Sequence, residues 1–185
     1  MPLPRLLKQA VVIVAFCAEA LASADAQTNT RWTDPGGHFS LGYESLGWSP
    51  ISSARQSPGD LISIEHKQFQ RSGHMRMCIA TQRRMRAREE LDQQRINSYV
   101  AAQTPADVAL ALGATPTQLI HVDVDGVTVN DITIEVPFQH LRVFYLLEGE
   151  NVLQFLVTCS ASDPVTPEVA ANITALLQTL HITSP

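Results

Sequence analysis

Apolar side chains alternate with polar ones along most of the chain, a pattern typical of half-buried β-strands. The predicted strands are residues 38–44, 60–66, 75–81, 118–124, 127–136, 141–148 and 152–160. The polar stretch 68–73 and the Asp125-Gly126 pair each favour a hairpin between the strands that flank them. Residues 152–160 are apolar on both faces, so we expect this strand near the centre of a sheet.

Three segments have helical spacing instead. Residues 83–102 are rich in Arg, Glu, Gln and Ala and predict a helix with a wide polar face. A second, short helix is expected to begin after Thr104, with Asp107 completing a capping box, and to end at Gly113. Residues 167–182 carry one apolar stripe and predict a C-terminal helix.

This order predicts an α+β fold. We expect a single antiparallel sheet of about six to seven strands, flanked by helices, with the C-terminal helix packed on the sheet. Residues 38–185 would form this one domain, and the polar segment 27–37 would be a flexible lead-in.

Residues 1–26 are typical of a secretory signal peptide. Arg5 and Lys8 precede an apolar run of nine residues, and small residues follow as far as Ala26. Cleavage after Ala26 is expected, with cleavage after Ala24 as the alternative. The run is too short for a membrane anchor, which needs about 20 residues. A lipid attached at Cys17 is disfavoured because the preceding residue is the bulky Phe16.

Composition narrows the classes of partner. The 185 residues have a net charge of −5 and are 45% hydrophobic, so the chain can bury a core but lacks the overall basic charge that is typical of nucleic-acid-binding proteins. Removing residues 1–26 removes two basic and two acidic side chains, which leaves the charge unchanged. We therefore expect a periplasmic or secreted protein with no nucleic-acid partner and no stable membrane insertion after cleavage.

Two cysteines, Cys78 and Cys159, remain after cleavage. In an oxidising compartment such a pair predicts one structural disulfide, worth about 4 kcal/mol for a loop of this length. The bond also requires the strands that carry the two cysteines to lie close together. Two buried free thiols, or a redox or metal pair, are the alternatives; no Cys-x-x-Cys spacing supports the latter.

The chain resembles the PsbP-like fold of the photosystem extrinsic protein and of DcrB-type bacterial envelope proteins. The resemblance covers about residues 38–182 and lies in the order and hydrophobicity of its elements: Phe39-Ser-Leu-Gly-Tyr-Glu followed by Trp48, Gly126 opening a strand, Val143-Phe-Tyr-Leu-Leu, Leu153-Gln-Phe-Leu-Val-Thr-Cys, and an end helix reaching Ile182. It implies a binding or assembly accessory. An arginine-rich stretch at residues 83–95 is a departure from the family pattern.

No catalytic or phosphate-binding motif occurs in the sequence, and we expect no cofactor. A metal site between His66 and His74, or a cation site at His121, Asp123 and Asp125, is a weaker hypothesis than a structural or solvated role for these residues. The remaining candidate is a partner-binding patch of arginines, which suit carboxylates and phosphates: Arg83, Arg84, Arg86, Arg88 and Arg95. The alternative is a solvated helix face paired with Glu89, Glu90 and Asp92.

Two function classes follow. The sequence favours an exported, non-enzymatic binding or assembly accessory whose partner is another protein of the bacterial envelope. The alternative is a small exported hydrolase with a site that the sequence does not reveal, which would need a pocket that gathers polar residues.

We predict that export removes residues 1–26. The intact mass of the protein recovered from the periplasm should match a chain that begins at Gln27. A recovered chain that keeps these residues would contradict the assignment.

Overall fold

The computed structural model describes residues 31–43, 46–51, 57–66, 76–87, 90–162 and 165–183. Its strands are β1 (Arg31–Thr33), β2 (Phe39–Gly42), β3 (Trp48–Pro50), β4 (Asp60–His66), β5 (Arg76–Arg86), β6 (Gln118–Val124), β7 (Val127–Ile134), β8 (Gln139–Glu148), β9 (Asn151–Ala161) and β10 (His181–Ile182). Its helices are α1 (Gln93–Ala101), α2 (Pro105–Leu112) and α3 (Pro167–Gln178). The predicted signal peptide lies outside the described residues.

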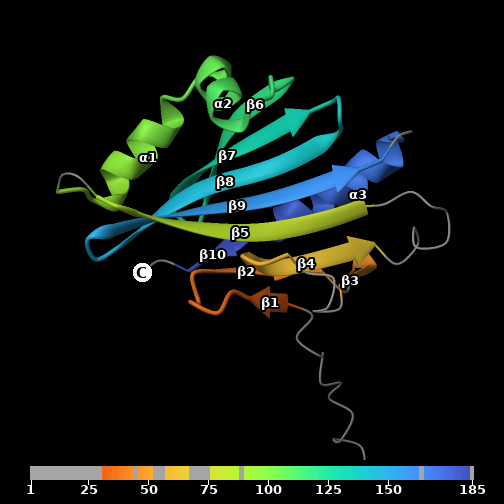
Figure 1. Ribbon diagram of the computed structural model, residues 1–185, viewed down its shortest axis with the longest axis horizontal. Coiled ribbons are helices and arrows are strands. Elements are labelled where there is room, and N and C mark those ends of the chain that lie inside the picture. Colours follow the sequence, from red (N-terminus) through yellow and green to blue (C-terminus); the bar gives the residue numbers. More distant parts are fainter. Residues whose placement is uncertain are drawn as a thin grey trace, which may run out of the picture.

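The α+β fold is confirmed, with one addition. Seven strands form an antiparallel sheet in the order β3-β4-β5-β9-β8-β7-β6, and β1, β2 and β10 form a second sheet of three strands (Figure 1). β9 is the central strand of the larger sheet, as its two-sided apolar pattern predicts. The first predicted strand, at residues 38–44, lies in the small sheet instead, because β2 pairs with β1 and β10.

Three predicted boundaries are wrong. The expected flexible lead-in joins the fold at Arg31, because Asp34 accepts hydrogen bonds from the backbone N–H groups of Gly36 and Phe39 and so fixes the turn from β1 to β2. The C-terminal helix ends at Gln178, and the chain then forms β10. The helix expected at residues 83–102 begins only at Gln93, because the preceding arginines continue β5 and pair with β9 as far as Arg86.

The other expected elements are present. The hairpin of β4 and β5 is antiparallel. α2 has the capping box of Thr104 and Asp107 and ends at Gly113, which has a left-handed backbone with φ of 70°. The Asp-Gly turn joins β6 to β7, with positive φ at both residues, as a two-residue hairpin of this type requires.

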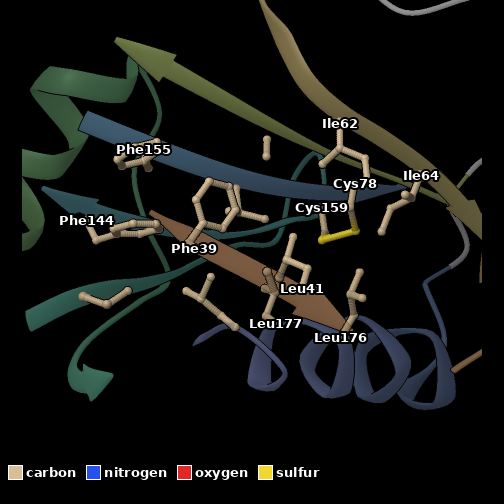
Figure 2. Close-up of a cluster of buried hydrophobic side chains, with 14 of the residues drawn as sticks. Phe39, Leu41, Ile62, Ile64, Cys78, Phe144, Phe155, Cys159, Leu176 and Leu177 are labelled. Carbon is tan, nitrogen blue, oxygen red and sulfur yellow. A yellow bond between two sulfur atoms is a disulfide. The ribbon is translucent and has the colours of Figure 1, made fainter. Parts of the chain in front are cut away.

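The larger sheet has two faces with different roles. One face, here called the α3 face, carries the main core: Phe144 and Phe155 stack at 5.1 Å between ring centroids, and Phe39 of β2 packs edge-on against both. Leu176 and Leu177 of α3 are fully buried in the same cluster (Figure 2). The opposite face, here called the α1 face, has a smaller core where α2 covers part of β7 and β8.

A disulfide joins Cys78 of β5 to Cys159 of β9 on the α3 face (Figure 2). The two residues lie directly opposite each other in the ladder, with Cα atoms 4.0 Å apart. The cysteine count therefore predicts the right pair, and the adjacency of the two strands that it requires is present. The bond fixes the early hairpin to the central strand of the sheet.

We predict that Leu176→Ala lowers the free energy of unfolding by about 2–5 kcal/mol, because it leaves a cavity in the main core. Leu110→Ala on α2 is the matched control, since 88% of Leu110 is exposed and its removal should have little effect. Chemical denaturation of both variants measures the difference. A near-neutral effect of Leu176→Ala would mean that α3 does not pack on the sheet as described.

Candidate functional site

The larger sheet splits where β7 and β8 separate. These strands pair from Ile134 and Gln139 as far as Asn130 and Val143. Beyond this point β8 continues to Glu148 beside β9, while β7 remains paired with β6 alone. The facing edges of β7 and β8 would therefore leave backbone N–H and C=O groups without partners, which is costly for buried backbone.

α1 fills the split with two amide side chains. Gln93 donates to the carbonyl of Tyr145 at 2.9 Å and accepts from the N–H of Leu147 at 3.1 Å, so it satisfies the edge of β8. Asn97 donates to the carbonyl of Gly126 at 2.8 Å and accepts from the N–H of Thr128 at 3.2 Å, so it satisfies the edge of β7. The two amides replace the missing ladder bonds and fix the position of the helix.

Because α1 is fixed above the split, it forms one wall of an open groove on the α1 face. The groove has a volume of about 1270 Å³. Its lining is mostly apolar, with two tyrosines and two arginines and no acidic residue: Met85, Arg86, Ala87, Leu91, Arg95, Ile96, Tyr99, Tyr145 and Val152. A concave surface of this kind is the usual form of a small-molecule site.

Two neighbouring rows of side chains cross the floor of the groove. Met85 of β5 and Val152 of β9 are paired and form an apolar row. The next row on the same face is polar: Arg83 lies opposite Gln154, which lies opposite Tyr145. Gln154 donates to the hydroxyl of Tyr145 at 2.9 Å. The floor thus changes from apolar to polar over one two-residue step, about 7 Å along a strand.

The pKa of Tyr145 lies above its ordinary value of 10.0, mainly because the ring is buried. The hydrogen bond from Gln154 opposes this rise, and the nearby Tyr99 adds a smaller one. The hydroxyl therefore keeps its proton at neutral pH. Since it already accepts from Gln154, its own proton is the part that can be donated to a ligand.

The predicted arginine patch is divided between the two faces of β5. Arg84 lies on the α3 face and pairs with Glu148 at 2.5 Å, and Arg86 pairs with Glu150 at 3.3 Å. Among the residues that the structure describes, none forms an ion pair with Arg83. Arg95, on α1, donates to the backbone carbonyl of Glu90 at 2.8 Å.

The expectation that these arginines share one helix face is therefore wrong, because β5 extends through three of them. Two of their carboxylate partners come from the end of β8 and the turn that follows it rather than from the acidic residues next in sequence. Arg88 lies outside the described residues. Arg86 and Arg95 are the members that line the groove, and Arg83 adjoins it through the polar row.

A second polar cluster lies beneath α3. Asp131 contacts His140 at 2.5 Å and accepts from Arg142 at 2.9 Å, and Arg142 also donates to the carbonyl of Leu177 at 2.6 Å. The Oγ1 of Thr174 lies 3.4 Å from the other ring nitrogen of His140. Hydroxyl, imidazole and carboxylate therefore stand in the order of a hydrolase triad. Their immediate effect is structural, because they join α3 to β7 and β8.

Burial alone would raise the pKa of Asp131, but its hydrogen bonds to His140 and Arg142 and the charges of these residues outweigh burial. The pKa of Asp131 is therefore held below its ordinary value of 3.8. The carboxylate is charged at neutral pH and stabilises the folded state there.

The metal hypotheses receive no geometric support. Within the described ranges, no group of three His, Cys, Asp or Glu side chains is placed to hold a metal ion. His121 contacts Asn130 on the α1 face, whereas His140 contacts Thr174 on the other face, so these two histidines lie on opposite sides of the sheet. Asp125 contacts His181. His66 is buried beside Trp48, and His74 lies outside the described residues.

Several groove residues were not predicted from the sequence. Tyr145, Gln154 and Met85 give no separate signal in an alternating strand. Arg95 and Tyr99 do give one, because residues four apart share a helix face. In the described part of the chain, no helix is long and apolar enough to cross a membrane.

Comparison with known proteins shows the fold. No family model matches the chain, and no curated protein matches it. Among solved structures it is similar to LpqN of Mycobacterium tuberculosis, involved in cell envelope biogenesis, with a TM-score of 0.52 and 9% identity over 86% of this chain and 87% of LpqN. Cyanobacterial PsbP from Synechocystis sp. PCC 6803 aligns with a TM-score of 0.49 and 13% identity over 88% of this chain and 99% of that protein. The PsbP-like resemblance is confirmed for the fold alone.

We predict that Asp131→Asn lowers the free energy of unfolding at neutral pH by about 3–5 kcal/mol, because Arg142 is left buried without its charged partner. A depressed carboxyl pKa stabilises the fold above the unfolded-state pKa and loses this effect as pH falls through the folded-state pKa. The difference between wild type and variant should therefore shrink below about pH 4. Denaturation at several pH values measures it.

Asp123→Asn is the matched control, because Asp123 is exposed and its bond to the N–H of Gly126 can also be made by Asn. Its effect should be small at every pH. A difference for Asp131→Asn that stays constant down to acidic pH would contradict the charged state assigned to this carboxylate.

Proposed function

We propose that the protein is an exported, non-enzymatic binding or assembly accessory of the bacterial envelope, and that the groove beside α1 is its binding site. The main observation in support of this proposal is the groove. It is open, its lining is mostly apolar, and its polar groups converge from α1 and from the strand row that contains Tyr145. A binding protein needs such a surface, and it needs no reacting group within it.

Location in the envelope is supported by separate features. The first residues are typical of a signal peptide, and a disulfide joins β5 to β9, which suits an oxidising compartment. The fold is similar to that of LpqN, which is described as involved in cell envelope biogenesis. From these features together we infer a partner or ligand that is itself a component of the envelope.

The alternative, a small exported hydrolase, is favoured by one observation, the order of Thr174, His140 and Asp131. Thr174 and His140 line neither the groove nor the cavity of about 320 Å³ beside β6. Arg142 also holds the carboxylate, which fits a structural link. Hydrolysis of a substrate that disappears in Thr174→Val, with the fold retained, would favour the hydrolase over the proposal.

We predict a contact in the groove that a photo-crosslinker can capture. Tyr99 is 67% exposed at the groove wall, so replacing it with p-benzoylphenylalanine should leave the fold intact. Irradiation in the native envelope should give a discrete adduct, to be identified by mass spectrometry. The same crosslinker at Leu110, exposed on α2 away from the groove, is the matched control and should not give this adduct. Identical products at both positions, or none at Tyr99, would contradict the groove as the binding site.

A further inference from the structure

The charged residues around the groove indicate which charge its ligand carries. Its lining contains two arginines and no acidic side chain, although the whole chain carries a net charge of −5. Glu148 and Glu150 are engaged by Arg84 and Arg86, at the end of the β8–β9 hairpin. Because Arg86 is already paired with Glu150, the positive charge that a ligand group meets comes from Arg95 in the lining and from Arg83 in the adjoining polar row. An anionic group is the complementary one.

On the floor of the groove, the polar row and the apolar row are separate. Arg83, Gln154 and Tyr145 form the polar row, and the proton of the Tyr145 hydroxyl is available to an acceptor. The neighbouring row of Met85 and Val152 is apolar and continues into Leu91 and Ile96 of the groove lining. An elongated ligand with a polar head and an apolar body matches this order of surfaces.

The backbone of the floor is already occupied. β5 and β9 pair as far as Arg86 and Asn151, and β8 and β9 pair as far as Glu148 and Asn151. Gln93 takes the remaining edge groups of β8 at Tyr145 and Leu147. An extended peptide gains its affinity from backbone hydrogen bonds, which this floor does not offer. Recognition here depends on side chains, and this favours a small amphiphile over a peptide strand.

We propose that the groove binds a single-chain amphiphile with an anionic head group, with its head at Arg83, Tyr145 and Arg95 and its alkyl chain along Met85 and Val152 against α1. This inference rests on the proposed function and names the ligand class for the same site. A carboxylate or phosphate head has the required chemistry, because both accept charge-assisted hydrogen bonds from guanidinium groups and from a neutral phenol.

The test is titration of the purified protein with cis-parinaric acid, a fluorescent fatty acid, and with its uncharged methyl ester. The acid should bind saturably, and the ester about tenfold or more weakly, because the charge-assisted bonds to the head are lost. Competition by a long-chain fatty acid and by a long-chain alkyl phosphate then distinguishes the two kinds of head. Equal binding of acid and ester would overturn the anionic head.

Two adjacent arginines provide the matched variants. Arg83→Gln, on the α1 face, should weaken binding of the acid several-fold and leave binding of the ester unchanged. Arg84→Gln, on the opposite face, should change neither. Met85→Glu should weaken both ligands, because it places a charge in the apolar row. Circular dichroism confirms that each variant is folded. Equal effects of Arg83→Gln and Arg84→Gln, or no effect of Met85→Glu, would overturn the assigned position.

Failure of the ligand class and failure of the proposed function give different results. If neither acid nor ester binds and the crosslinker at Tyr99 still forms its specific adduct, the amphiphile is wrong and the binding function remains. If the specific adduct is also absent, both the ligand class and the proposed binding function of the groove are wrong.

Discussion

The separation of β7 from β8 is the constraint on which the open face of the molecule depends. A sheet that splits must satisfy two new strand edges, and here Gln93 and Asn97 of one short helix do so with both ends of their amide groups. Ile96 and Val100 of the same helix are buried. The helix is therefore held by hydrogen bonds as well as by apolar contact, and the groove that it bounds is a fixed part of the fold.

The two faces of the sheet differ: the α3 face holds the main core, and the α1 face holds the groove that we propose as the binding site. The α3 face holds the disulfide, the three phenylalanine rings and the buried cluster around Asp131. On the α1 face, α2 covers β7 and β8 where they are paired and α1 covers the split, and elsewhere the face presents half-buried side chains. Substitutions in the groove therefore leave the main core untouched. The specificity of the groove can change while the fold is preserved.

Patterns of short range predicted much of the fold. Thr104 and Asp107 predicted α2 because capping is local chemistry, and Asp125-Gly126 predicted its hairpin because the turn needs those two residues. The arginines of β5 were assigned to a helix because their composition favours one, and pairing with β9 overrides this preference. Gln93 and Asn97 could not be recognised, since an amide that completes a sheet and an amide that faces water look the same in a sequence.

The small sheet determines how the molecule is oriented relative to anything to which it is attached. β2 lies between β1 and β10, so the first and last strands described are neighbours of one strand (Figure 1). β2 packs its Phe39 on the α3 face, on the side of the larger sheet opposite the groove. A tether joined to either of these strands would therefore attach on the side of the protein opposite the groove. The groove would then face away from the point of attachment.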